Sequence, residues 1–186
     1  NYDSPKKRVT GTAGAEVDPR KEIGDNWPLR KGYVDPVKRK RLLIVYHSKT
    51  GKNGVMAKAV SEGAHHPDID VDVSFKEAKE AGIKDLLEAD GIIFGTPENF
   101  GYMSGALKDF FDRTFYEVEG QVDGKPYCML VGAGNDGTGA LIAIRRICNG
   151  YSFKEVQEPI VVVGDLEDQQ LQTCRELGLA MAAGLE

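Results

Sequence analysis

Three short segments of this sequence combine glycine with polar or aromatic side chains in a way that suits ligand binding. The first contains Ser48, Thr50 and Asn53, with Lys49 and Lys52 between them, directly after an apolar run. Donors gathered at the start of a helix, where the helix dipole places about half a positive charge, suit a phosphate group. The alternative is a helix start capped by Ser or Thr that binds nothing, although a helix needs only one such cap.

This first segment does not have the spacing of a nucleoside triphosphate clamp. A Walker A loop would need glycine at position 46 and Ser or Thr at position 53, where Tyr46 and Asn53 stand. The sequence therefore predicts a phosphate site of another kind.

The second segment, residues 95–105, places Phe100 and Tyr102 on either side of Gly101. Aromatic side chains contact a planar ring through offset or edge-on geometry. Glycine beside them frees backbone amides to face the nitrogen and oxygen atoms of that ring. The alternative is that both aromatic side chains cover the surface of the domain.

The third segment, Gly132–Gly137, matches the pattern GxGxxG. A dinucleotide fingerprint belongs in the first βα turn of a domain, whereas this segment follows the fourth predicted strand. We favour a flexible wall whose amides approach a flat ligand closely, which glycine permits. A true dinucleotide loop and a plain surface turn are the alternatives.

The elements between these segments predict how they come together. Apolar runs predict strands at 42–46, 69–73, 91–95, 127–131 and 160–163, and helical periodicity predicts helices at 55–63, 83–89, 107–115, 140–148 and 171–181. A loop is predicted over 96–105. Fivefold alternation of strand and helix favours a parallel sheet with helices on both faces. Loops that leave the carboxyl ends of such strands meet at one edge, where ligands bind.

Composition excludes several classes of protein. The chain has 186 residues, of which 41% are hydrophobic and 28% charged, with a formal net charge of −5. These values favour one globular domain and argue against collagen-like or disulfide-scaffold proteins. No stretch approaches the roughly 20 apolar residues that span a bilayer, and the acidic balance gives no reason to expect nucleic acid. Three cysteines without CxxC spacing predict a reduced, cytoplasmic protein.

The charge is divided unevenly along the chain. Residues 1–40 hold ten Lys or Arg and six Asp or Glu, whereas residues 41–186 hold 14 basic and 23 acidic residues. The first stretch is poor in hydrophobic residues and punctuated by Pro and Gly, so it cannot form a core of its own. We expect a basic N-terminal arm over 1–40, anchored through Trp27, Leu29 and Tyr33, or an unstructured tail. Residues 41–186 would then form the ligand-binding domain.

Two of the segments carry a family resemblance. Ser48–Asn53 is similar to the flavodoxin phosphate loop, S/T-x-T-G-x-T, and residues 95–105 resemble the GTPxxFGxMSG segment of NAD(P)H:quinone oxidoreductases of the WrbA type and related FMN reductases. Residues 56–64 are also similar to the first helix of that group. The resemblance covers about residues 41–165. It implies a flavodoxin-like three-layer α/β sandwich with a five-stranded parallel sheet of order 2-1-3-4-5 and bound FMN.

The resemblance also implies which residues hold FMN. The phosphate would lie on the first loop, the isoalloxazine ring would lie on the second, and the third would cover the pyrimidine side of the ring. In that order, the implied residues are Ser48, Lys49, Thr50, Gly51, Lys52 and Asn53; Pro97, Glu98, Asn99, Phe100 and Gly101; and Ala133, Gly134, Asn135, Asp136 and Gly137.

Three departures from the family pattern bear on function. Asn53 replaces the last Thr of the phosphate loop, although its amide can still donate. The third loop has no aromatic residue to stack on the flavin, which leaves one face open and favours an enzyme. Only about 20 residues separate Gly139 from the last strand, so the longer insertion of the reductases, and with it their acceptor and assembly, is not implied.

The sequence thus predicts an FMN-dependent oxidoreductase that passes hydride from NADH or NADPH to a quinone, free flavin or similar small acceptor. A flavodoxin-type one-electron carrier and a flavin-free interaction domain are the alternatives. Hydride chemistry of this kind belongs to the cofactor, so no catalytic side chain and no metal ligand are assigned. The arm could serve a homo-oligomer.

Overall fold

The computed structural model describes residues 39–186, which form one compact unit. The predicted arm, with its anchors Trp27, Leu29 and Tyr33, lies almost entirely outside the described residues. Its role and the exact boundary at residue 40 therefore stay predictions.

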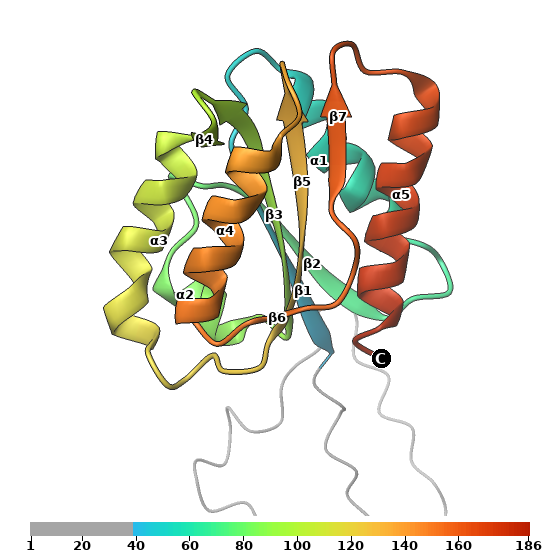
Figure 1. The fold of residues 1–186 in the computed structure, drawn as a ribbon. Coiled ribbons are helices and arrows are strands. Elements are labelled where there is room, and N and C mark those ends of the chain that lie inside the picture. The colour runs from blue at the N-terminus through green and yellow to red at the C-terminus, as the bar shows by residue number, and fades with distance from the viewer. Residues whose placement is uncertain (1–38) are drawn as a thin grey trace, which may run out of the picture. The chain divides into compact units, whose positions relative to one another are not determined.

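Strands and helices alternate along the described chain as the hydrophobic pattern predicts (Figure 1). The strands are β1 (Lys40–Tyr46), β2 (Val71–Glu77), β3 (Gly91–Asn99), β4 (Tyr102–Met103), β5 (Pro126–Ala133), β6 (Lys154–Glu155) and β7 (Ile160–Val163). The helices are α1 (Lys52–Ala64), α2 (Ile83–Glu88), α3 (Gly105–Val118), α4 (Thr138–Gly150) and α5 (Asp168–Ala183).

The five main strands are parallel and lie in the order β2-β1-β3-β5-β7, which confirms the predicted order 2-1-3-4-5. The two-residue strand β6 was not predicted. It pairs with the amino-terminal end of β5, and β7 pairs with the carboxyl-terminal half. The last position of the sheet is therefore shared by two short strands.

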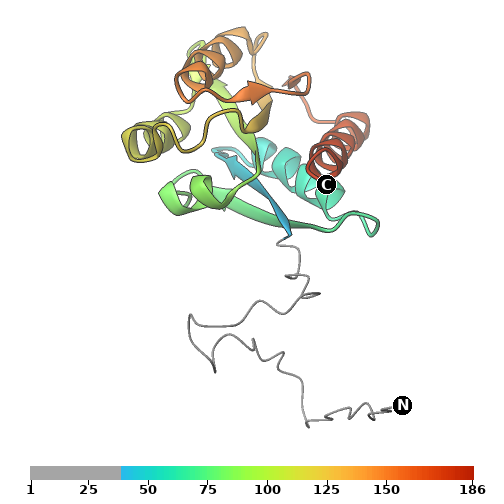
Figure 2. The same ribbon diagram turned by 90° about the horizontal axis from the view of Figure 1, so that it is seen from below.

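Helices cover both faces of the sheet, as Figure 2 shows from below. Helices α1 and α5 pack on one face around an aliphatic core that includes Ile44, Ile93 and Leu130. Helices α2, α3 and α4 pack on the other face around an aromatic core. There the ring of Phe94 lies 5.0 Å from that of Phe111 and 6.0 Å from that of Tyr127. Because the central strands are covered on both faces, their sequences are apolar throughout.

The predicted loop at 96–105 is wrong in one respect, because much of it is a β-hairpin. Strand β3 continues to Asn99, and Thr96 and Pro97 still lie in register with β5. Strand β4 then turns back and pairs with the end of β3. Pro97 and the nearby glycines favoured a loop in the sequence, but proline is tolerated where a strand leaves its ladder. The strand β2 is likewise shifted, to 71–77 from the predicted 69–73.

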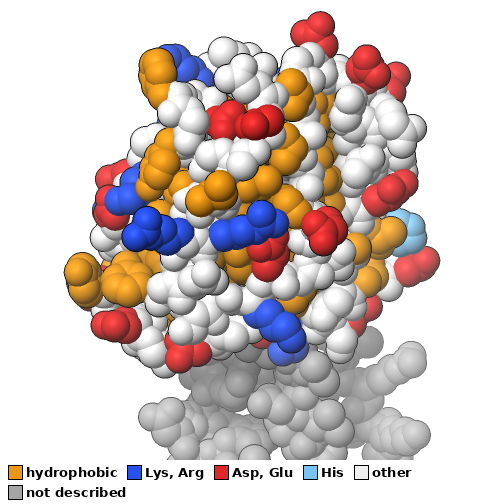
Figure 3. Space-filling model, viewed as in Figure 1, with side chains coloured by type: hydrophobic (Ala, Val, Ile, Leu, Met, Phe, Trp, Pro, Cys, Tyr) orange, Lys and Arg blue, Asp and Glu red, His pale blue; other side chains and the backbone are white. Residues whose placement is uncertain are grey.

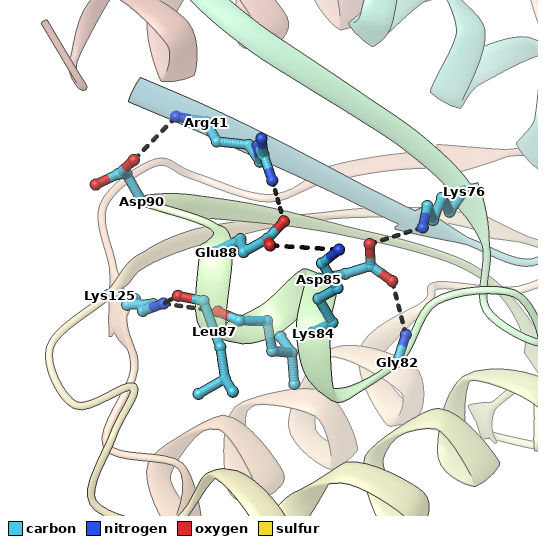
Figure 4. A network of polar contacts seen from close by, with 10 residues as sticks. Arg41, Lys76, Gly82, Lys84, Asp85, Leu87, Glu88, Asp90 and Lys125 are labelled. Carbon is cyan, nitrogen blue, oxygen red and sulfur yellow. Dashed lines mark hydrogen bonds and ion pairs between the residues drawn. The ribbon is translucent and has the colours of Figure 1, made fainter. Parts of the chain in front are cut away.

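A polar network holds the six-residue helix α2 against the amino-terminal ends of the strands (Figure 4). Arg41 donates from its side chain to Glu88, and its backbone amide donates to Asp90 at 2.9 Å. Partial burial raises the pKa of Asp90, but the Arg41 amide and the Lys40 ammonium outweigh it and hold that pKa below its ordinary value. A helix this short is not stable by itself. These contacts fix it at the sheet edge opposite to the ligand-binding loops.

Helices α1 and α5 approach so closely that glycine is required at two positions. A Cβ atom on Gly63 of α1 would lie 1.9 Å from the carbonyl oxygen of Arg175, and one on Gly178 of α5 would lie 1.9 Å from that of Val60. No real Cβ contact is this short, and the obstructing atoms are backbone. The two helices would have to move apart to accept a larger residue.

We therefore expect Gly63→Ala and Gly178→Ala each to lower the free energy of unfolding by about 2 kcal/mol or more, as overpacking does. Urea unfolding would measure the loss as a lower midpoint at constant m value. Gly105→Ala is the control, because the first residue of α3 has open space at its Cβ. Equal stability of Gly63→Ala and Gly105→Ala would contradict the close helix contact.

Candidate functional site

The three predicted segments meet at the carboxyl edge of the sheet, at the top of Figure 1. We call residues 47–54, 95–105 and 132–139 together the rim. Hydrogen bonds join all three segments: the His47 amide donates to the Gly95 carbonyl at 2.9 Å, and the Gly132 amide donates to Asn53 Oδ1 at 2.9 Å. The third link is made by Glu98, which contacts the start of α4. The rim is thus one connected structure.

The first segment presents an open helix N-terminus. Gly51 is the N-cap of α1 with a φ of 97°, a left-handed conformation that favours glycine, and no side chain caps the helix there. The first turn of α1 contains no acidic residue. Its amides point out of the helix without an intrahelical partner and carry the positive end of the dipole.

Ser48 adds a second feature beside this N-terminus. Its Oγ is buried yet has no hydrogen-bond partner among residues 39–186. A buried hydroxyl without a partner costs free energy, on the order of 1–3 kcal/mol. An anion bound at the helix start would accept this hydrogen bond and would remove the cost. Lys49, Thr50 and Gly51 are exposed around the same place.

Lys52 and Asn53 face away from this opening. The ammonium group of Lys52 donates to the carbonyl oxygens of Val162 at 3.0 Å and Gly164 at 2.5 Å, and Ala133 lies at 3.4 Å. The side chain of Asn53 is buried and accepts from Gly132. Both side chains tie α1 to the ends of β5 and β7, so any part they play in anion binding falls to their backbone amides.

The second segment ends in a tight turn with unusual backbone geometry. Phe100 and Gly101, the two residues between β3 and β4, have φ values of 53° and 69°. A left-handed conformation costs a residue other than glycine roughly 1–2 kcal/mol. The Phe100 ring is also fully exposed, at 108% of its reference area. A strained turn that holds an aromatic ring in solvent is a feature of ligand sites rather than of cores.

Glu98 occupies the N-terminus of α4, a contact that sequence reasoning missed. Its carboxylate accepts from the amides of Gly139 at 3.0 Å, Gly137 at 3.2 Å and Ala140 at 3.4 Å. The backbones also touch, since a Cβ on Gly139 would lie 1.9 Å from the Gly101 carbonyl oxygen. The only hint in the sequence is that α4 starts without a capping side chain at its N-cap, Gly137. The resemblance placed Glu98 beside the flavin ring instead.

The third segment is divided between strand and loop. Ala133 is buried as the last residue of β5, whereas Gly134, Asn135 and Asp136 are exposed at the rim. Gly137 is buried and begins α4. Pro97 and Asn99 are half-buried in the hairpin that faces this loop across the end of the sheet. The residues predicted to contact the ring therefore lie at the carboxyl ends of two adjacent strands, β3 and β5, and in the loops that follow them.

The cysteine thiols of residues 39–186 are poorly placed for chemistry. The thiols of Cys128, Cys148 and Cys174 are buried, and burial raises the pKa of each. No group of three or more His, Cys, Asp or Glu residues in this part of the chain could hold a metal ion. Within the same residues, no helix has both the length and the apolar character needed to cross a membrane.

Comparison with known proteins gives one family and a common fold. The sequence profile of the family described as NADPH-dependent FMN reductase matches residues 55–168. A flavodoxin from Aquifex aeolicus is 30% identical over 158 residues, which cover 76% of this chain and 85% of that protein. An NAD(P)H dehydrogenase (quinone) from Acidithiobacillus ferrooxidans is 40% identical over 93 residues, or 40% of this chain and 46% of that protein.

The fold is that of flavodoxins. The crystal structure of the flavodoxin, WrbA-like protein from Agrobacterium tumefaciens superimposes with a TM-score of 0.65 at 22% identity. The match covers 78% of this chain and 97% of that one. The predicted flavodoxin-like three-layer fold is confirmed.

Glu98 allows a direct test of how the rim is held together. We expect Glu98→Ala to lower the free energy of unfolding by about 1–2 kcal/mol, because α4 loses the anion at its N-terminus. Glu98→Gln keeps an acceptor oxygen but loses the charge, so it should lose less. Denaturant unfolding would measure both, with Glu117→Ala, an exposed glutamate of α3, as the matched control. If Glu98→Ala is as stable as Glu117→Ala, the contact does not stabilise the rim.

Proposed function

We propose that this chain, which belongs to the NADPH-dependent FMN reductase family, is an FMN-dependent oxidoreductase that passes hydride from NADH or NADPH to a small acceptor. A quinone or a free flavin would be such an acceptor. The observation that carries the proposal is the buried Ser48 hydroxyl without a partner, next to the uncapped N-terminus of α1. It lies on the same rim as the strained Phe100–Gly101 turn.

The helix termini support the phosphate position independently. Ser104 caps α3, Glu98 contacts the start of α4, and α5 begins with a capping box and Asp168. Asp85 serves the start of α2. Among the five helices of residues 39–186, α1 alone has neither an acidic residue in its first turn nor a side chain that accepts from an amide at its start. An external anion would therefore find its unsatisfied donors there.

The phosphate group would lie on Ser48, Thr50 and the amides of residues 49–53. The ring would lie between the hairpin, with Pro97, Phe100 and Gly101, and the loop 134–137. A left-handed Gly101 leaves open space on its Cβ side and exposes the neighbouring amides. Glu98 would not touch the ring. It would position the hairpin by binding the N-terminus of α4.

When bound, FMN supplies the hydride acceptance and release, and the protein residues do the positioning. The amides of the hairpin turn stabilise negative charge that develops on the ring. The third loop has no aromatic side chain over the site, so nicotinamide and acceptor can reach the same face in turn. No acidic or basic side chain is needed at the reacting atoms.

A flavodoxin-type one-electron carrier is the second candidate. It is favoured by the name of the relative from Aquifex aeolicus, which aligns over 85% of its length. The open third loop argues for the reductase instead. A cytoplasmic location is proposed with either function, since three thiols without disulfide partners suit a reducing compartment.

The phosphate site is tested by comparing FMN with riboflavin, which lacks the phosphate. We expect Ser48→Ala to weaken FMN binding about tenfold or more, the loss of one hydrogen bond to a charged group. Riboflavin binding should not change. Fluorescence titration would measure both affinities, with Ser61→Ala, farther along α1, as the control. A parallel loss for the two flavins would mean that Ser48 does not contact the phosphate.

The activity itself is tested by adding NADPH, and separately NADH, to the FMN-loaded protein without oxygen. For a reductase, one equivalent bleaches the yellow flavin absorbance, and an added quinone restores it. A carrier would resist both nicotinamides, although dithionite would reduce it in two separate steps. A preparation that takes up no FMN would exclude both candidates and leave an interaction domain.

A further inference from the structure

A groove runs between α3 and α4, and it begins at the rim. Its upper part, of about 480 Å³, is lined by Gly101, Tyr102 and Gly139 at the rim end. Its lower part, of about 280 Å³, reaches Tyr116 and Gly150 at the far end. The two parts share Lys108, Arg146 and Ile147, so they adjoin along the same helix pair, and we call them together the groove.

The length of the groove follows from the helix that forms its wall. Gly139 and Gly150 are eleven residues apart on α4, which corresponds to about 16 Å along the helix axis. Gly101 and Gly139, whose backbones are in close contact, both line the upper part of the groove, so its rim end lies next to the hairpin of the proposed ring site. A molecule lying in it would have one end at the rim.

The middle of the groove is positively charged. The ammonium of Lys108 is paired with Asp112 at 2.6 Å, so Lys108 contributes little net charge. Arg146 is exposed and has no ion-pair partner among residues 39–186, in contrast to its neighbour Arg145, which binds Glu155 at 2.7 Å. Figure 3 shows blue cationic side chains in the middle of the face formed by α3 and α4, with red acidic side chains beside some of them and hydrophobic side chains above and below.

The far end of the groove offers a flat aromatic surface. Tyr116 is 81% exposed, and its ring is held edge-on against Phe115 at 5.2 Å. Phe115 in turn packs edge-on against Tyr151 at 5.1 Å. This support keeps an exposed ring in place, where it can stack on another planar group.

The geometry points to the α3–α4 groove as the binding site for the adenosine and phosphate portion of NADPH or NADH. This inference rests on the proposed function. The nicotinamide ring would lie at the rim near Gly101, the phosphates at Arg146, and the adenine on Tyr116. A dinucleotide has two planar ends and an anionic centre, and the groove has complementary groups in the same order. The upper part also has the volume typical of small-molecule sites.

The direct test is binding of adenosine 2′,5′-bisphosphate, which carries the adenosine and phosphates but no nicotinamide. Calorimetry on the full chain loaded with FMN should detect binding. We expect Arg146→Glu to weaken it at least tenfold and Tyr116→Ala to weaken it about threefold or more, as the loss of a stacking contact does. The matched control is Lys58→Glu, the same reversal of charge at an exposed residue of α1 on the opposite face. It should change affinity less than twofold.

A kinetic measurement adds a second readout. The donor N-benzyl-1,4-dihydronicotinamide has the reacting ring but no phosphates or adenine. The ratio of kcat/KM for NADPH to that for this truncated donor should fall at least tenfold in Arg146→Glu and stay within twofold in Lys58→Glu. All variants should unfold at the same denaturant midpoint, since Arg146 and Tyr116 are exposed.

The outcomes separate this inference from the proposed function. If the bisphosphate does not bind the unaltered protein, or if Arg146→Glu binds it as well as Lys58→Glu does, the groove is not the adenosine site. A groove that serves as a docking face for a protein or a second copy would give this result. If the bisphosphate binds as expected but neither donor bleaches the flavin, the groove assignment holds and the reductase activity is wrong.

Discussion

The organisation of the site depends on which helix N-terminus is left without an internal anion. Parallel sheets of this kind direct several helix starts toward one edge, and each start carries unsatisfied amides and the positive end of a dipole. In this chain Glu98 supplies the anion for α4, and α5 carries its own acidic first turn. Helix α1 has neither, and it has the buried Ser48 hydroxyl beside it. The anion proposed for the rim would therefore bind at α1, because side chains of the protein already occupy the N-termini of the other helices.

The same contacts explain why the rim can hold a strained turn. The left-handed Phe100 would relax if the hairpin were free, but Glu98 binds one side of the hairpin to α4, and β3 continues its pairing with β5 beneath it. Lys52, which donates to the Ala133 carbonyl, and Asn53, which accepts from the Gly132 amide, fix the third segment from the α1 side. The sequence pattern assigned the charge of Lys52 to phosphate binding. In the structure its ammonium group instead donates to carbonyl oxygens at the ends of β5 and β7. The rim is held together by hydrogen bonds between residues that are 39 to 81 positions apart in the chain.

The strand order and the meeting of the three segments could be predicted because they follow from local periodicity and chain connectivity. A continuous apolar run such as 42–46 is typical of a strand that is buried on both faces of a parallel sheet. Right-handed crossovers between such strands then place the following loops at one edge of the sheet. The roles of Lys52 and Glu98 could not be found this way. The lysine could bind either a phosphate or backbone carbonyls, and the glutamate could contact either a ring or backbone amides. Which partner each side chain binds depends on which groups the fold brings within about 3 Å. The hairpin at 98–103 was missed for a related reason: β3 runs two residues past its last partner in β5, Pro97↔Gly132, and there pairs with β4 through only two residue pairs, which Pro97 and the glycines in the sequence did not favour.

Residues 41–186 contain 14 basic and 23 acidic residues, and this net negative charge opposes the binding of an anionic dinucleotide. The objection weakens when distance is considered, because charges in water are screened within about 10 Å at ordinary ionic strength. A phosphate in the α3–α4 groove would lie within that range of Arg146, and the acidic residue that lines the groove, Asp112, is paired with Lys108. The pairing of Lys108 with Asp112 and of Arg145 with Glu155 leaves Arg146 as the groove's unneutralised cation among residues 39–186. An unpaired side chain such as Arg146 therefore has more influence on where an anion binds than the net charge of the whole domain has.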